Sequence, residues 1–120
     1  MVKELIKEFS NQQALEIEKI DWDEYNLFLG GNNWSLNTTS SWRIIFNSQL
    51  FGNSDSEISS KLESLKGTKI VKILSFGDKD LDFSLVLDNG SEIQFFCNSF
   101  FEPWIFRIGD NFILVASYSN

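Results

Sequence analysis

The sequence predicts an α+β fold made mainly of antiparallel β-sheet, with about six to eight strands arranged as hairpins or a meander. Two short helices complete this prediction, one at the N-terminus and one internal, near residues 56–66. Three observations carry it: Asn89-Gly90 lies between two β-rich runs, most other β-rich runs are separated by short turn sequences, and only two segments show helical periodicity. Short connections favour antiparallel neighbours.

The N-terminal helix is predicted from the spacing of Val2, Leu5, Ile6 and Phe9, which places four apolar side chains on one helical face. Ser10-Asn11 is expected to end it. A helix this short needs packing against another element to be stable.

The next segment predicts several strands. Residues 15–19 alternate apolar and charged side chains, and the acidic run 21–24 is expected to break that strand. Residues 25–29 form a second candidate strand, followed by a turn at 30–33. Residues 34–38 and 42–46 read as a hairpin joined through 39–41.

The internal helix is predicted from Ile58, Leu62 and Leu65, which recur at helical intervals. Either Ser54 or Asp55 is expected to cap its N-terminus. Gly67 stands where a glycine commonly ends a helix.

The rest of the chain reads as strands. Residues 68–76 are rich in β-branched side chains, 77–80 form a turn, and 82–97 form a hairpin with a two-residue type I′ turn at Asn89-Gly90. In that hairpin five positions are expected to face the core: Phe83, Leu85, Leu87, Ile93 and Phe95. Pro103 marks a break before a last hairpin over 104–108 and 111–117.

Length and composition indicate a single domain over residues 1–120, with 42% hydrophobic residues to form one core. Cys97 is the only cysteine, lies in an apolar strand, and is expected to be a buried, unreactive thiol. The N-terminal segment lacks the uninterrupted apolar run of a signal peptide, and no stretch has the length of a membrane span. These features predict a cytoplasmic protein.

Several kinds of chemistry have no support in the residues. The chain has no histidine, which excludes catalysis by Ser-His or Cys-His pairs and zinc sites built on histidine. Residues 78–82 begin like a calcium loop, but Phe83 and Asn89 stand where that loop needs Gly and Glu. We therefore expect no catalytic residue, no cofactor and no metal.

The net charge of −7 disfavours binding to nucleic acid or anionic membranes and favours a basic protein partner. Acidic residues concentrate at Glu16–Glu24 and again at Asp78–Glu92. Trp22, between two aspartates, is the candidate aromatic anchor. The predicted partner-binding residues are Asp21, Trp22, Asp23, Glu24, Asp78, Asp80 and Asp82. A solvated acidic surface with no partner is the alternative interpretation of the same charges.

The residues between Trp42 and Trp104 include a pattern that resembles a known family. It comprises Trp42-Arg43-Ile44-Ile45, the loop from Leu50 to Asp55, a short helix before Gly67, Asp80-Leu81-Asp82, Asn89-Gly90, Ile93-Gln94-Phe95 and Glu102-Pro103-Trp104. This pattern resembles a family of small bacterial domains encoded beside polymorphic toxins of the contact-dependent inhibition type, where they look like immunity proteins. The resemblance covers about half of the chain, and no functional residue carries over from it.

The resemblance implies a non-catalytic immunity protein that binds and neutralises a cognate toxin, with a nuclease as the toxin class that an acidic inhibitor suits. Two other functions remain open from the residues alone. One is a generic acidic domain for protein–protein interaction, and the other is an enzyme that uses a pair of carboxylates, as glycosidases do.

Overall fold

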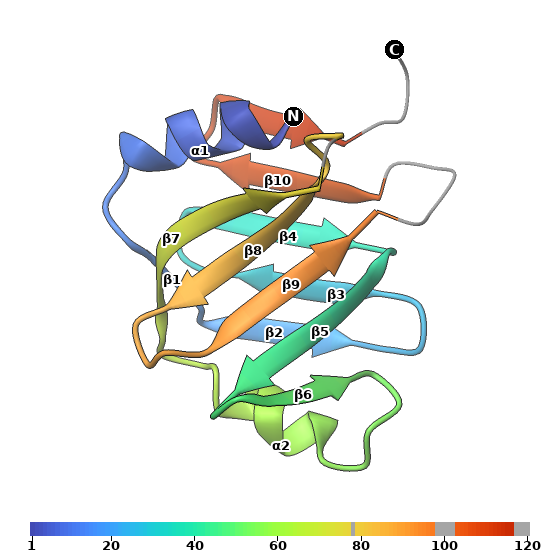
Figure 1. The fold of residues 1–120 in the computed structure, drawn as a ribbon. Helices are drawn as coiled ribbons and strands as arrows, with labels where there is room; N and C mark the ends of the chain where they lie inside the picture. Colours follow the sequence, from blue (N-terminus) through green and yellow to red (C-terminus); the bar gives the residue numbers. More distant parts are fainter. Residues whose placement is uncertain (78, 98–102, 117–120) are drawn as a thin grey trace.

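Two antiparallel β-sheets packed face to face, with a helix at each end, make up the computed structural model of this protein (Figure 1). It describes residues 1–77, 79–97 and 103–116. The predicted class, α+β and mainly antiparallel, is confirmed. The described residues form eleven strands, more than the six to eight expected from the sequence.

The six-stranded sheet lies in front in Figure 1 and has the order β1-β7-β8-β9-β5-β6. Its strands are β1 (Leu15–Glu16), β7 (Lys69–Phe76), β8 (Asp82–Leu87), β9 (Glu92–Phe96), β5 (Ser41–Phe46) and β6 (Gln49–Gly52). The five-stranded sheet behind it has the order β11-β10-β4-β3-β2. Its strands are β11 (Phe112–Val115), β10 (Trp104–Ile108), β4 (Trp34–Thr38), β3 (Leu27–Gly30) and β2 (Lys19–Trp22).

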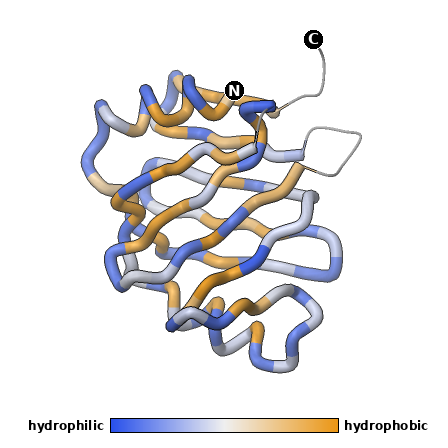
Figure 2. The backbone as a smooth tube through the Cα atoms, viewed as in Figure 1, coloured by the Kyte–Doolittle hydropathy of each residue, from blue (hydrophilic) through white to orange (hydrophobic). Residues whose placement is uncertain are grey.

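The core fills the space between the two sheets. Hydrophobic residues alternate with polar ones along many strands, as expected when one face of a strand is buried (Figure 2). Trp104 is almost fully buried, and its ring packs edge-on against Phe83 of the other sheet at 5.0 Å between centroids. Its indole Nε1 also donates to the carbonyl oxygen of Leu81 at 2.9 Å, so one side chain joins the two sheets.

Both predicted helices are present. Helix α1 (Val2–Ser10) buries Val2 and Leu5, while Ile6 and Phe9 pack against the core. Helix α2 (Ile58–Glu63) is shorter than predicted: Ser64 is its C-cap, so Gly67 does not end it as expected, although φ at Gly67 is +87°. No helix in the described part of the chain combines the length and apolarity needed to cross a bilayer.

The predicted cap of α2 is wrong. Glu57 occupies the N-cap position, and no side chain there makes a capping hydrogen bond. The Asp55 carboxylate instead accepts from the backbone N–H of Gly52 at 2.6 Å and closes the loop after β6. A short aspartate side chain bonds to whichever nearby N–H is free, and here that donor belongs to the preceding turn.

The strand predicted over residues 15–19 is divided between the two sheets. β1 ends at Glu16, and Ile17 carries the chain inward, where its side chain is fully buried. The Ile17 N–H bonds to Thr68 beside the six-stranded sheet, and the Glu18 N–H bonds to Gly30 of the five-stranded sheet. β2 then continues through Asp21 and Trp22, where the acidic run was expected to end a strand.

The hairpin predicted from residues 34–38 and 42–46 is wrong, because β4 and β5 belong to different sheets. β5 pairs with β9 and with β6, a strand that the sequence did not indicate. The crossing is held by Thr38, whose hydroxyl donates to Pro103 O at 2.6 Å and accepts from Ser40 N at 3.0 Å. The periodicity of the two strands is the same whether they pair or separate, so it did not reveal this corner.

The hairpin of β8 and β9 has the predicted faces but a different turn. Phe83 pairs with Phe95 and Leu85 with Ile93, and all four are buried. Only Gly90 has positive φ in the turn, Gly90 N bonds to Leu87 O, and Leu87 N bonds to Ser91 O. This is a three-residue loop of a type I turn followed by a left-handed glycine. A two-residue turn would have placed odd-numbered residues of β8 opposite even-numbered residues of β9. Core-facing residues of one strand would then have paired with residues of the other face.

Candidate functional site

The residues predicted to bind a partner lie in two separate parts of the molecule. Asp21 and Trp22 belong to β2, and Asp23 and Glu24 to the β2–β3 turn, at the right in Figure 1. Asp80 and Asp82 lie at the β7–β8 connection beside the N-terminus, and Asp78 falls outside the described residues. The fold therefore does not bring the two segments together into one surface.

Asp80 and Asp82 both bond to the protein's own main chain. The Asp80 carboxylate accepts from the α-ammonium of Met1 at 2.7 Å and from Lys3 N at 3.4 Å, and its carbonyl accepts from Val2 N at 3.1 Å. Partial burial raises the pKa of Asp80, but these donors outweigh it and hold that pKa below its ordinary value. Asp82 accepts from the N–H of Cys97 at 2.7 Å. Asp80 thus holds the N-terminal residues, and Asp82 holds the backbone directly after β9.

The residues of β2 and the β2–β3 turn are more accessible. Asp21 and Glu24 are exposed, whereas Trp22 is half-buried and packs against the core. Asp23 accepts from the N–H groups of Tyr25 and Asn26, and these bonds lower the pKa of its carboxyl group. Tyr25 is 72% exposed and is the accessible aromatic side chain of this turn. The sequence analysis missed Tyr25, although its place directly after the acidic run was a signal.

Most carboxylates of the described residues fall into two groups, apart from Glu4, Glu8 and Glu63, which bond to the N-terminus, Gln12 and Lys66. Asp23, Asp55, Asp80, Asp82 and Asp88 each accept from a backbone N–H of the protein itself. Another group has side chains without an ion pair or hydrogen bond among the described residues: Glu16, Glu18, Asp21, Glu24, Glu57, Glu92 and Asp110. Carboxylates without an internal partner are free to meet cations from outside.

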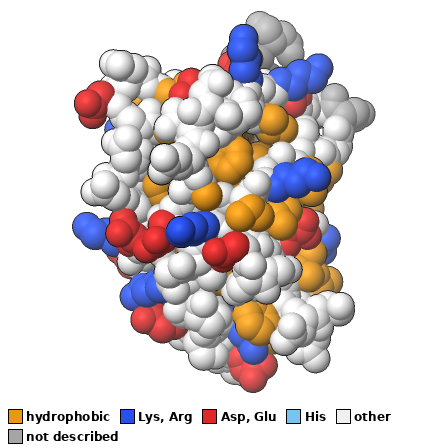
Figure 3. Space-filling view, turned by 90° about the vertical axis from the view of Figure 1, so that its left-hand side faces the viewer, with side chains coloured by type: hydrophobic (Ala, Val, Ile, Leu, Met, Phe, Trp, Pro, Cys, Tyr) orange, Lys and Arg blue, Asp and Glu red, His pale blue; other side chains and the backbone are white. Residues whose placement is uncertain are grey.

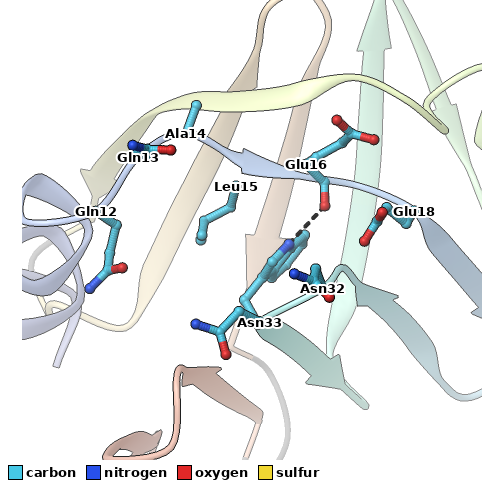
Figure 4. Close-up of a pocket in the computed structure, with 9 residues that line it drawn as sticks. Gln12, Gln13, Ala14, Leu15, Glu16, Glu18, Asn32 and Asn33 are labelled. Atoms are coloured by element: carbon cyan, nitrogen blue, oxygen red, sulfur yellow. Dashed lines mark hydrogen bonds between the residues drawn. The ribbon is translucent and has the colours of Figure 1, made fainter.

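Three carboxylates of this second group, Glu16, Glu18 and Asp110, line two adjoining hollows. The first has a volume of about 380 Å³ and is lined by Gln12, Gln13, Ala14, Leu15, Glu16, Glu18, Asn32, Asn33 and Trp34. The second, of about 290 Å³, is lined by Glu8, Gln12, Asn33, Ile108, Gly109, Asp110, Asn111 and Phe112. Because both are lined by Gln12 and Asn33, we treat them as one feature, the amide groove. Figure 4 shows the first hollow, with side-chain amides and carboxylates around it.

The walls of the amide groove are held by specific contacts. Trp34 Nε1 donates to the carbonyl oxygen of Glu16 at 2.8 Å, a bond between β4 and β1 that Figure 4 marks with a dashed line. Gly31 lies against this bond, and a Cβ there would stand 2.3 Å from Glu16 O and from Trp34 Nε1. Position 31 therefore accepts only glycine without displacing Trp34. The backbone N–H of Gly109 closes the other side by bonding to Asn33 O at 2.8 Å.

The chemistry of the amide groove is that of a cation-accepting surface. Its carboxylates are Glu8, Glu16, Glu18 and Asp110, and no lysine or arginine is among the described residues that line it. Glu8 accepts from Gln12 Nε2 at 2.9 Å, while the other three have no hydrogen-bond or ion-pair partner among the residues that the structure describes. Figure 3 views the side of the molecule on which α1 and β1 lie; acidic and basic side chains both cross its middle. Lys69 of β7 pairs with Glu16 of β1 across the sheet, although it is not among the residues that line the two hollows.

Cys97 carries no nucleophilic chemistry. Its Sγ donates to Leu81 O at 3.0 Å, and burial together with the neighbouring Asp82 charge raises the thiol pKa to about 12. The thiol is therefore protonated at neutral pH. Within residues 1–77, 79–97 and 103–116, no group of three or more acidic or thiol side chains is arranged to hold a metal ion.

Comparison with protein-family models, with curated proteins and with solved structures gave no match. The candidate site therefore stands on its own geometry. Sequence reasoning placed Glu16 and Glu18 in an acidic cluster but did not include them in the site. The five side-chain amides of the groove, Gln12, Gln13, Asn32, Asn33 and Asn111, carried no sequence signal, because polar residues of this kind are ordinary between strands and helices.

Proposed function

We propose that this protein is a non-catalytic immunity protein that binds a basic toxin domain, of the nuclease class, and blocks its nucleic-acid-binding surface in the cytoplasm. The observation that carries the proposal is the amide groove, where three carboxylates without internal partners line hollows that no described lysine or arginine shares. The net charge of −7 and the resemblance to immunity proteins support it.

The groove suits a partner that presents lysine or arginine side chains. Glu16, Glu18 and Asp110 supply charge, and the side-chain amides can both donate to and accept from a partner's backbone. Opposite charges across an interface speed association, especially at low salt. A nuclease must bind phosphates with cations, so an acidic inhibitor competes with its substrate for the same side chains.

The first test is binding and protection. We expect the protein to form a complex with the product of the neighbouring upstream gene when the two are co-expressed and purified, and to restore growth of cells that express that product. If neither a complex nor protection is observed, the proposal is wrong. A complex without any toxic activity in the partner would instead identify a generic acidic interaction domain.

The second test locates the surface. We expect the double substitution Glu16→Lys with Glu18→Lys to raise the Kd for the toxin about ten- to a hundredfold, mainly through a slower association rate. Glu57→Lys is the matched control, since Glu57 is exposed, its side chain has no partner within the described ranges, and it lies at the start of α2, away from the groove. Equal effects of the groove and control substitutions would contradict binding at the groove.

The originally predicted turn is tested in the same way. Asp21→Lys with Glu24→Lys should leave the Kd within about threefold of the unsubstituted protein if the partner sits on the amide groove, because those side chains are screened from it. A larger loss from this pair than from the Glu16 and Glu18 pair would move the partner to the β2–β3 turn.

A further inference from the structure

A separate hollow lies at the opposite end of β3 from the amide groove. It has a volume of about 230 Å³ and is lined by Glu24, Tyr25, Thr39, Ser40, Ser41, Trp42 and Asn53. We call it the turn hollow. It is formed where the β2–β3 turn meets the crossing from β4 to β5 and the loop after β6. Asn53 Nδ2 donates to the carbonyl oxygen of Glu24 at 3.3 Å and so ties two of these segments together.

Ser40 gives this hollow an unusual property. The residue is only 5% exposed, and its hydroxyl oxygen has no hydrogen-bond partner among the described residues. Its backbone N–H is already satisfied by Thr38. Buried hydroxyl groups nearly always have a partner. The Ser40 oxygen has almost no accessible surface of its own, so a group that arrives in the hollow bonds to it only after the side chain rotates.

The rest of the lining defines what that group is. Glu24 brings an exposed carboxylate that has no partner in the described part of the chain, and Tyr25 brings an aromatic ring that is 72% exposed. Thr39 adds a further hydroxyl, and no lysine or arginine is among the described lining residues. Acceptor oxygens next to a free aromatic face suit a cation that is planar and carries only donors.

We propose that the turn hollow binds a guanidinium group, such as that of an arginine side chain. The planar guanidinium stacks on Tyr25 and pairs with the Glu24 carboxylate, and it donates to the Ser40 hydroxyl once rotation about the Cα–Cβ bond turns that hydroxyl toward the hollow. Guanidinium is more weakly hydrated than ammonium and presents several donors at fixed angles, which favours it over lysine here. The inference does not depend on the proposed immunity function, since it concerns a different surface and can be tested without a toxin.

The test is an NMR titration of the isotope-labelled protein with Nα-acetyl-arginine amide. We expect saturable shifts of the backbone signals of Tyr25, Ser40 and Asn53, with a Kd on the order of millimolar, as suits one small ligand. Nα-acetyl-lysine amide should bind more weakly, and the uncharged Nα-acetyl-norleucine amide should give no saturable shift. Absence of saturation with the arginine compound, or equal binding of the norleucine compound, would overturn the proposal.

The source of the guanidinium is decided by two further probes. A Gly-Gly-Arg-Gly-Gly peptide that binds as well as the capped residue indicates an arginine side chain of a protein. Tighter binding of free arginine than of either capped form indicates a small metabolite instead.

Substitutions separate a binding role from a structural one. Glu24→Gln should weaken binding of the arginine compound about tenfold, while Glu57→Gln should leave it unchanged. Ser40→Ala should weaken binding several-fold and yet raise the melting temperature, because it removes an unpaired buried hydroxyl. Ser84 is the matched control, since its hydroxyl is also buried and unpartnered but lies in β8. Ser84→Ala should raise the melting temperature without changing arginine binding, and equal effects of the two serines on binding would contradict the assignment.

Discussion

The carboxylate of Asp80 binds the first residues of the chain through hydrogen bonds and an ion pair. It accepts from the Met1 ammonium and the Lys3 N–H, and φ at Asp80 is +56°, a backbone conformation that Asp and Asn tolerate better than most residues. Asn in its place keeps the shape and the backbone preference but removes the charge. The substitution therefore isolates the electrostatic part of this contact.

We expect Asp80→Asn to lower the free energy of unfolding by about 1 kcal/mol near neutral pH, the usual magnitude for a charge at a helix N-terminus. Since folding lowers the pKa of Asp80, its contribution is complete above the unfolded value of 3.8 and disappears as pH falls through the folded value. Urea unfolding at pH 7 measures the loss of stability, and the same experiment at pH 2.5 measures how much of that loss remains in acid. Asp110→Asn, at an exposed turn, is the control and should change little. A difference that is no smaller at pH 2.5 than at pH 7 would contradict the explanation.

A second prediction for a single residue concerns the reactivity of the Cys97 thiol. With a pKa of about 12, the thiol should react with iodoacetamide at pH 8 at least a hundredfold more slowly in the folded protein than in urea. Mass spectrometry of timed samples measures the rate. Fast modification of the folded protein would show that Cys97 is more accessible than its bond to Leu81 O implies.

The sequence analysis was accurate for residues whose role follows from periodicity. Val2, Leu5, Leu85 and Ile93 were assigned to the core by spacing alone and are buried. It could not tell which acidic side chains the fold would use internally, because an aspartate that caps a loop looks the same as one that faces solvent. That is why Asp80 was predicted for partner binding alone, whereas the fold also uses it to hold the chain's first residues.

Among the elements, the β5–β6 hairpin has the strained turn. Asn47 and Ser48 have φ values of +50° and +66°, the pattern of a type I′ turn, in which glycine is preferred at the second position. We expect Ser48→Gly to raise the free energy of unfolding by about 0.5–1 kcal/mol, because glycine takes positive φ without steric cost. Chemical denaturation measures the change.

The matched control for that prediction is Ser59→Gly in α2, where φ is helical. Glycine there should lower stability by about 0.5 kcal/mol, because helical residues gain nothing from its freedom. Stabilisation by both substitutions would show that the turn is not the cause.

The two turns also show why the prediction of elements succeeded only in part. Asn89-Gly90 has the composition of a type I′ turn, yet the type I′ geometry occurs at Asn47-Ser48, which composition does not favour. In β8 and β9 the buried residues on each strand must meet, so tertiary packing selected a three-residue loop that lets Leu85 face Ile93. Strand pairing thus overruled the local preference of the turn.

At the scale of the whole molecule, Trp104 joins the two sheets. Replacing it by Phe should lower the free energy of unfolding by about 2 kcal/mol, from lost packing against Phe83 and the lost hydrogen bond to Leu81 O. Trp22→Phe is the control: that ring is half-buried, so its loss should cost less than about 1 kcal/mol. Equal destabilisation by the two substitutions would mean that Trp104 does not have this special role.

The arrangement of the whole molecule also explains why neither the amide groove nor the turn hollow could be predicted from the sequence. The groove brings Gln12, Glu16 and Asn33 together with Asp110, from segments far apart along the chain. Each segment was identified as a turn or strand, but their meeting depends on strand order, which periodicity does not contain.

The crossings between sheets have a consequence for how the molecule unfolds. The chain enters the six-stranded sheet at β1, leaves it for β2 to β4, returns for β5 to β9 and ends with β10 and β11 in the other sheet. Neither sheet is therefore encoded by one continuous stretch, and no single cut leaves both sheets whole. The two layers depend on each other for completion, so the protein should lose its structure in one cooperative step, with no stage at which one layer persists alone.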